Sequence, residues 1–220
     1  MVRPRVRLVL AVSLDGRLAP AEGGAAQLGG PGDRCCLEEA LCWAEAVVLG
    51  AQTLRLHGTS CLIHAPDLLQ QRHQKGLPPQ PKVMVWSRGG EIPPELPFFR
   101  QPLERWLLRA APGALPPDAE APGFSRILPF HTWTEALEQM GGLGLERVVA
   151  LGGAQLAASL MTAAVVDEIQ LTLCPTLLGG SHLWLPAQAR GDASIRWALL
   201  EHRALAGGEL LLHYERQEGL

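Results

Sequence analysis

The residues best placed to bind a charged small molecule are the paired glycines Gly152-Gly153. They follow the apolar run Val148–Leu151 and precede segment 154–161, which consists mostly of residues that favour a helix. This order predicts a strand, a tight turn and a helix. Because glycine has no side chain, the first N–H groups of that helix are open to an anion, and the helix dipole favours negative charge there. The pattern suits a pyrophosphate, although paired glycines also serve as plain turns.

A second glycine pair, Gly179-Gly180, follows another predicted strand. Beyond Asp167-Glu168, the apolar residues at positions 169, 171 and 173 alternate with three others, which is the period of a strand with unlike faces. Pro175 ends this strand, and Gly179-Gly180 allow a ligand to approach the backbone closely. The two glycine pairs and the strand between them favour a nucleotide site over simple turns.

These motifs resemble those of the RibD C-terminal family, the reductase domain of the bacterial riboflavin-biosynthesis deaminase-reductase. That family reads E-G-G-x-x-L, then V-D-E and an apolar residue, then P-x-L-L-G-G. The matching segments here are Gly152–Leu156, Val166–Ile169 and Pro175–Gly180, while Leu151 replaces the acidic residue of the first motif.

The resemblance implies an α/β fold like that of dihydrofolate reductase, with a mixed central sheet flanked by helices. It also implies an NADPH cofactor bound by Gly152, Gly153, Gln155 and Leu156 from the first motif. The third motif would add Leu178 and Gly179 to the cofactor site.

The N-terminal segment carries the most specific match. A predicted buried strand, Val6–Val12, leads into Ser13-Leu14-Asp15-Gly16-Arg17, and the family has a similar A-x-S-L-D-G-R that here begins at Ala11. The carboxyl end of a central strand is where open α/β sheets bind their ligands, so the resemblance places Ala11 and this loop in the nicotinamide pocket. Asp15 is our candidate catalytic residue; the alternative is a turn residue that caps its own backbone.

Two further strands end in candidate cofactor residues. Strand Ala46–Leu49 is followed by Gly50 and Thr53, which match the family's D-A-V/I-L-x-G-x-x-T, with Glu45 in place of the aspartate. The resemblance implies that Gly50 and Thr53 border the nicotinamide ribose and phosphates. A second strand, Lys82–Trp86, ends in Ser87-Arg88. A hydroxyl and an arginine at such an end suit the 2′-phosphate of NADPH, although a solvated arginine is equally common there.

The substrate side matches the family less well. Relatives in the riboflavin pathway show a tryptophan and a T-S pair, then L-R-A, then D-D-P with a later arginine, and these groups hold the pyrimidine and the ribose phosphate. The equivalent stretches here are 27–30, 41–43 and 57–59, and they lack those residues. Arg34 and Arg55 are candidates to replace the missing cations, with exposure to solvent as their alternative role.

Composition narrows the possible functions. The chain has 220 residues, 47% of them hydrophobic, and a net charge of −3, so residues 1–220 fit one domain and nothing favours a nucleic-acid partner. The short apolar run Leu8–Val12 cannot span a bilayer, which predicts a cytoplasmic protein without a membrane partner. Five cysteines show no disulfide or zinc pattern, and the zinc-deaminase signature is missing; we therefore expect no metal and a reductase domain alone.

The remaining elements complete the predicted fold. A helix is expected from Asp33, as its N-cap, through Ala44, and another over 131–141 with Thr132 or Thr134 as its cap. Segments 195–200 and 209–214 predict an antiparallel hairpin at the C-terminus. Exposed apolar strands of this kind pair with a second subunit, so we expect a homodimer.

We therefore expect an NADPH-dependent reductase resembling 5-amino-6-(5-phosphoribosylamino)uracil reductase, acting on a small heterocyclic or ribosylamino substrate. Two alternatives stay open: a family member with a different substrate, or an NADP-binding module that has lost catalysis. A nucleotide-binding transferase on a Rossmann sheet is disfavoured, because Ser13-Leu14-Asp15-Gly16 stands where that fold has G-x-G-x-x-G.

Overall fold

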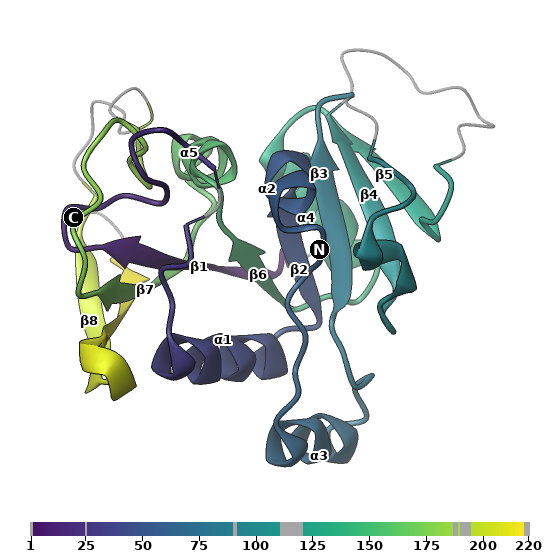
Figure 1. The fold of residues 1–220 in the computed structure, drawn as a ribbon. Helices are drawn as coiled ribbons and strands as arrows, with labels where there is room; N and C mark the ends of the chain where they lie inside the picture. The colour runs from purple at the N-terminus through teal and green to yellow at the C-terminus, as the bar shows by residue number, and fades with distance from the viewer. Residues whose placement is uncertain are drawn as a thin grey trace.

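A single mixed sheet organises the protein (Figure 1). The computed structural model describes residues 2–24, 26–89, 92–110, 121–186, 189 and 195–217. In this part of the chain, nine strands form one sheet in the order β5-β4-β3-β2-β6-β1-β7-β9-β8. The strands are β1 Arg5–Ser13, β2 Ala46–Gly50, β3 Lys82–Ser87, β4 Arg105–Ala110, β5 Arg126–Phe130, β6 Arg147–Leu151, β7 Glu168–Cys174, β8 Trp197–Ala204 and β9 Leu210–Arg216. The helices are α1 Pro31–Trp43, α2 Ala51–His57, α3 Pro66–Gln74, α4 Trp133–Gly142 and α5 Ala154–Thr162, with short 3-10 turns η1 Pro97–Arg100 and η3 Ala206–Gly208.

Strand direction confirms the predicted architecture. The seven strands β5, β4, β3, β2, β6, β1 and β7 are all parallel to one another. The strand β9 runs antiparallel to both β7 and β8, so β8 and β9 form the expected C-terminal hairpin. Because the parallel strands share one direction, their carboxyl ends, and the loops that follow them, lie along the same edge of the sheet.

Helices cover both faces of the parallel part of the sheet. Alternate residues of each strand point to opposite faces. Val47 and Leu49 belong to one apolar core with residues of α1, α2 and α3, whereas Val48 belongs to a second core with residues of α4 and α5. Burial on both faces explains why the central strands are apolar runs rather than alternating patterns.

The start of α1 differs from our prediction. Asp33 is not the N-cap: the helix begins at Pro31, and Gly30 is the N-cap without a side-chain hydrogen bond of its own. The helix end is instead capped by the buried carboxylate of Glu209, which accepts hydrogen bonds from the N–H groups of Gly30 at 2.5 Å and Asp33 at 2.9 Å. A carboxylate is well placed there, since the helix dipole favours negative charge at its N-terminus.

The cap of α4 agrees with the sequence. Thr132 is the N-cap, and its Oγ1 accepts a hydrogen bond from the N–H of Glu135 at 3.2 Å. The Glu135 carboxylate in turn accepts from the N–H of His131 at 2.8 Å. This reciprocal arrangement satisfies backbone donors at the start of the helix and selects Thr132 over Thr134.

Candidate functional site

The sheet leaves one stretch of backbone unpaired at its carboxyl edge. The pairing of β1 with β6 ends at Val9 opposite Leu151, but β1 continues to Ser13 beside β7. Ala11 therefore lies in a part of β1 that has a strand neighbour on one side only. Gly152-Gly153 begin where β6 stops, so the predicted nicotinamide strand and the predicted phosphate turn lie at the same edge.

The glycine turn after β6 packs against the start of α2. Both glycines have positive φ, 28° at Gly152 and 93° at Gly153. A Cβ atom on Gly153 would lie 2.6 Å from Oγ1 of Thr53, and this hydroxyl is 3.5 Å from the carbonyl oxygen of Gly152. Gly50 is the N-cap of α2 and lies three residues before Thr53. The structure therefore brings Thr53 and the glycine turn into contact, and the role of these residues and of Gly50 in binding a cofactor stays a prediction.

The helix α5 presents its N-terminus at this turn. Gly153 is its N-cap and carries no side chain that would cover the N–H groups that follow. Leu156 is only 1% exposed, with its side chain in the core, so its contribution to a cofactor site is limited to its backbone. The first turn of α5 thus offers a bare backbone surface suited to an anion.

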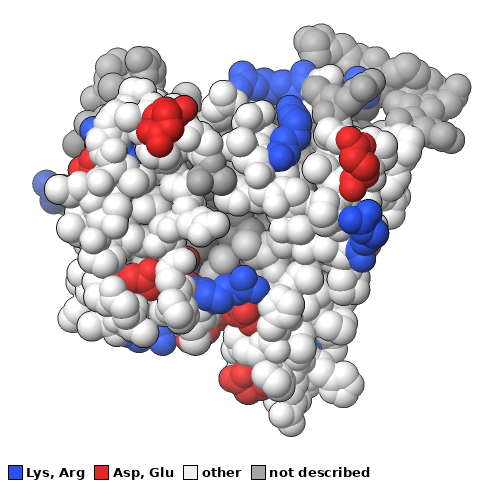
Figure 2. All heavy atoms as spheres, in the orientation of Figure 1, with Lys and Arg blue, Asp and Glu red and all other residues white. Residues whose placement is uncertain are grey.

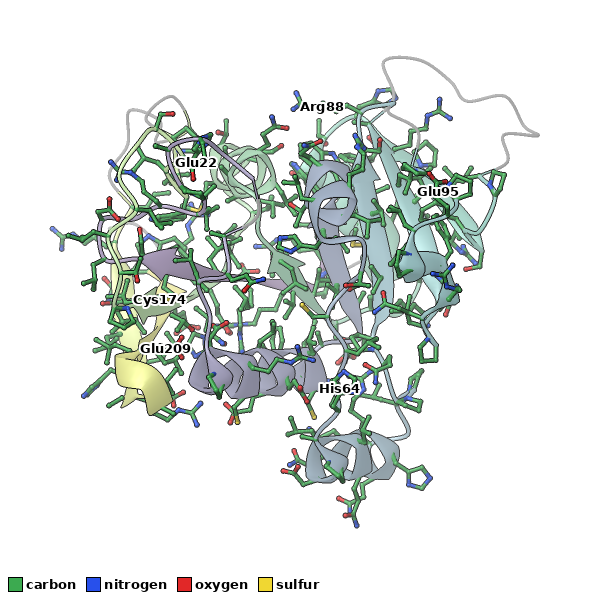
Figure 3. The ribbon with its side chains drawn as sticks, viewed as in Figure 1. Glu22, His64, Arg88, Glu95, Cys174 and Glu209 are labelled. Atoms are coloured by element: carbon green, nitrogen blue, oxygen red, sulfur yellow. The ribbon has the colours of Figure 1, made fainter. Side chains whose placement is uncertain are left out.

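The arginine after β3 points to α5. Nη2 of Arg88 donates a hydrogen bond to Oε1 of Gln155 at 3.1 Å, and its guanidinium lies 5.4 Å from the ring centroid of Trp86. Figure 3 shows Arg88 at the top of the view, beyond the end of β3. Ser87 is buried, and its hydroxyl accepts a hydrogen bond from the N–H of Gly89 at 3.3 Å, which shapes the turn after β3. Two predicted cofactor residues, Arg88 and Gln155, are thus in direct contact.

The remaining candidates form a separate contact at the ends of β1 and β7. Asp15 Oδ1 accepts a hydrogen bond from the N–H of Leu178 at 3.1 Å, and Oδ2 accepts one from the N–H of Gly179 at 2.8 Å. The hydroxyl of Ser13 donates to the same carboxylate at 2.5 Å. The Ser13 hydroxyl, followed by the Leu178 amide, lowers the pKa of Asp15 from 3.8 to about 2. Asp15 is therefore ionised at neutral pH, which disfavours a role as a general acid; its catalytic role stays a prediction.

A pocket of about 380 Å³ lies beside Thr53 on the α1 and α2 side of the sheet. Its walls carry one arginine, two histidines, several hydroxyls, one amide side chain and two leucines from the strand ends. Its lining is Arg34, Leu49, Thr53, His57, Thr59, Ser60, Cys61, Leu62, His64, Gln101 and Leu151. Figure 2 shows a hollow near the middle of one face, with basic and acidic side chains scattered among uncharged ones around it.

The pocket separates the two arginine candidates. Arg34 belongs to its wall: Nε donates to Glu38 at 2.9 Å and Nη2 donates to the carbonyl oxygen of Leu62 at 3.3 Å. Arg55 is exposed and is not part of the wall. Burial acts to raise the pKa of Glu38, but hydrogen bonds from the N–H groups of Ala65 and His64 and from Arg34 hold it below 4.5. The Glu38 carboxylate therefore fixes Arg34 at the pocket.

The sequence did not single out His57 and His64 as pocket residues. His57 is the last residue of α2. The backbone N–H of His64 donates a hydrogen bond to the Glu38 carboxylate at 2.7 Å, and Figure 3 shows His64 near one end of α1. The available signal was the position of His57, which lies in the stretch 57–59 that corresponds to the D-D-P of the resembling family; no such signal marks His64.

Fold and site together define an α/β protein of the dihydrofolate-reductase type. The structure superposes on RibD from Acinetobacter baumannii with a TM-score of 0.79 at 22% identity, covering 98% of this chain and 58% of that one. It superposes on a dihydrofolate reductase from Enterococcus faecalis, complexed with NADP(H), with a TM-score of 0.55 at 14% identity, covering 97% of each chain.

The chain belongs to the RibD C-terminal domain family, whose model matches residues 4–211. It is 29% identical over 182 residues to the riboflavin biosynthesis protein RibD of Haemophilus influenzae, covering 80% of this chain and 48% of that protein; it thus spans about half the length of that relative. It is 26% identical over 185 residues to the 2,5-diamino-6-ribosylamino-4(3H)-pyrimidinone 5′-phosphate reductase of Methanothermobacter thermautotrophicus, covering 81% of both.

Proposed function

We propose that the protein is an NADPH-dependent reductase of a ribosylaminopyrimidine phosphate. The relative from Methanothermobacter thermautotrophicus is named as a reductase of such a substrate, which supports the proposal. The observation that carries the proposal is the contact of the Gly152-Gly153 turn with Thr53 at the open edge of β1. This contact joins two motifs that lie 99 residues apart in the chain. The sequence analysis predicts that both motifs bind the same cofactor.

The residues present fit a phosphorylated dinucleotide. The first turn of α5 offers backbone donors for a pyrophosphate, and the hydroxyl of Thr53 lies beside it. Arg88, oriented by Gln155, supplies a guanidinium for a further phosphate. We assign the 2′-phosphate to Arg88, which favours NADPH over NADH. When bound, this cofactor supplies a hydride, and the chain's residues orient it and exclude water.

The hydride acceptor would occupy the pocket that shares Thr53 with the cofactor site. Its lining contains Arg34, His57 and His64 and no carboxylate among the described residues, so it suits an acceptor with an anionic group. Reduction converts the ribosylamino side chain to a ribitylamino side chain. Water can supply the proton that accompanies the hydride.

One observation favours the alternative of a different substrate. Leu151 lines the pocket where the resembling family carries an acidic residue. A leucine cannot accept a hydrogen bond, so a pyrimidine amino group would lack that partner here. A family member with a more apolar acceptor remains our second candidate.

The test combines calorimetric binding with turnover. We expect NADPH to bind more tightly than NADH, and Arg88→Ala to weaken NADPH binding about tenfold or more while leaving NADH binding unchanged, since a charged hydrogen bond is worth roughly 1.5–3 kcal/mol. Arg55→Ala is the matched control, because Arg55 is exposed and lies outside the pocket wall. Oxidation of NADPH is then followed with 5-amino-6-(5-phosphoribosylamino)uracil. Binding without turnover on any pyrimidine acceptor would favour the degenerate module, and no heat with either coenzyme would refute the proposal.

A homodimer and a cytoplasmic location belong to the same proposal. Leu199 and Leu200 are 50% and 51% exposed on β8, an edge strand of the sheet, which supports pairing with a second subunit. Sedimentation of the protein and of a Leu199→Lys variant tests the dimer. In the described residues, the structure contains no helix that is long and apolar enough to cross a membrane.

A further inference from the structure

Both oxygens of the Asp15 carboxylate are used to hold another part of the chain. The partners are the N–H groups of Leu178 on Oδ1 and Gly179 on Oδ2, with the Ser13 hydroxyl as a third donor. Leu178 lies 163 residues away, in residues 175–180, which we call the 175–180 loop. The carboxylate thus joins the end of β1 to the loop that follows β7.

Other contacts tie the same two segments together. Arg17 donates from Nε to the carbonyl oxygen of Gly180 at 3.0 Å and from Nη1 to the carbonyl oxygen of Asp15. The N–H of Leu14 donates to the carbonyl oxygen of Thr176 at 2.9 Å. The 175–180 loop is therefore held from outside by the Ser13–Arg17 turn.

The backbone of the 175–180 loop needs such support. Gly179 and Gly180 have φ values of 67° and 73°, in the left-handed region. Glycine pairs lose much conformational freedom on folding, so a loop of this kind stays in one conformation only when the surroundings determine it. Gly180 also lies against the segment that follows the Ser13–Arg17 turn, because a Cβ atom on Gly180 would be 2.6 Å from Cα of Ala21.

The anchored loop lies at the edge that forms the candidate cofactor site. It follows β7, the direct neighbour of β1 over residues 7–13, beyond the point where β6 ends. Because the N–H groups of Leu178 and Gly179 already donate to Asp15, these two predicted cofactor residues must contact a dinucleotide through other atoms. Their position relative to Ala11 then depends on Asp15.

The charge state of Asp15 agrees with this role. All three hydrogen bonds require the carboxylate to accept, and they are strongest when it is ionised. The carboxylate carries no proton to give at neutral pH, as the lowered pKa of about 2 indicates.

We propose that Asp15 is a positioning residue: its carboxylate fixes the 175–180 loop against the end of β1 and so shapes the nicotinamide end of the cofactor site, without donating a proton. The inference rests on the proposed function for the identity of the ligand. The anchoring itself is a property of the free protein.

The test uses Asp15→Asn, with Glu22→Gln as the matched control. Glu22 is an exposed acid seven positions further along, labelled in Figure 3, and Asn retains one of the two acceptor oxygens of Asp15. Amide hydrogen exchange of the free protein reports on Leu178 and Gly179. We expect Asp15→Asn to speed exchange at these two amides about tenfold or more, because one hydrogen bond to a charged acceptor is lost. Glu22→Gln should leave the exchange unchanged.

Kinetics separate positioning from proton donation. A positioning residue predicts that Asp15→Asn raises KM for NADPH about tenfold, with the shape of the pH profile from about pH 5 to about pH 9 unchanged. Loss of kcat together with loss of one limb of that profile would establish a proton donor and overturn the inference. Unchanged exchange at Leu178 and Gly179 would overturn it as well. If the unsubstituted protein binds no dinucleotide, the proposed function fails, and exchange still decides whether Asp15 holds the loop.

Discussion

Replacing Gly153 by alanine tests the contact on which the cofactor site depends. Gly153 has φ 93° and ψ 125°, a conformation that residues with a side chain rarely adopt, and forcing alanine into it costs about 1–3 kcal/mol. The new Cβ would also lie 2.6 Å from Oγ1 of Thr53. Relief of that overlap moves α2 or the turn and adds about 1 kcal/mol or more. We expect Gly153→Ala to lower the free energy of unfolding by about 2–4 kcal/mol, a large part of a typical total of about 5–15 kcal/mol.

The chain offers a control that separates strain from overlap. Gly144 has φ 80° but no atom within 4 Å of the position of an added Cβ, so Gly144→Ala should cost only the backbone strain, about 1–2 kcal/mol. Thr53→Ala removes the overlapping hydroxyl, so the double variant with Gly153→Ala should recover about 1 kcal/mol relative to the sum of the single variants. Urea unfolding of the four variants and the unsubstituted protein measures these differences. Equal costs for Gly153→Ala and Gly144→Ala, or strict additivity with Thr53→Ala, would show that the turn and α2 are not in contact.

Three further predictions concern buried charges away from the glycine turn. Glu209→Ala should destabilise the protein by about 1–2 kcal/mol in urea unfolding, with Glu209→Gln intermediate, because the carboxylate caps α1; equal effects of both variants would contradict this. Arg72→Met should lower the free energy of unfolding by about 2–4 kcal/mol, because the fully buried guanidinium donates to the carbonyl oxygens of Leu41, Cys42 and Ala44. A variant whose unfolding temperature is no lower than that of the unsubstituted protein would refute this. Burial opposes ionisation of Glu168, but His213, Arg7 and Arg5 lower its pKa from 4.5 to about 2; its contribution to stability is therefore complete above about pH 4.5 and is lost as the pH falls toward 2. Glu168→Gln should flatten this acid limb of the stability curve, and an unchanged limb would exclude Glu168 as its source.

The strands and the glycine turns were predictable because their signals are local. The run Val148–Leu151 with Gly152-Gly153 specifies a strand end and a bare helix start within a few residues, and the structure has both. The alternation at 169–173 likewise gave β7. Such patterns depend on the period of the backbone and on the conformational freedom of glycine, and neither requires knowledge of distant residues.

The errors arose where the deciding partner is distant in sequence. Asp33 has the residue type of an N-cap, but Glu209, 176 residues away, takes that role, and no local pattern indicates it. The same applies to Arg72: no local pattern marks it as buried, yet this arginine is 0% exposed because it reaches the carbonyl groups at the end of α1. Leu156 matches the family motif, but its side chain contributes to the core.

The site consists of two parts that depend on different chemistry, and this explains why the resemblance holds for one and weakens for the other. The proposed dinucleotide part consists of backbone groups, glycines and Thr53, whose positions are fixed by the ends of β1, β2 and β6. Any change there disturbs the packing of the sheet, so the motifs are recognisable. The pocket is lined largely by side chains from the segment 57–64, with Arg34 from α1. Arg34, His57 and His64 can change without altering a strand. We therefore propose that substrate choice is decided in the pocket, where Leu151 is the one lining residue from β6 among the residues that the structure describes. A Leu151→Glu variant that gained turnover on a ribosylaminopyrimidine phosphate, with NADPH affinity unchanged, would show that this one position separates the two candidate substrates.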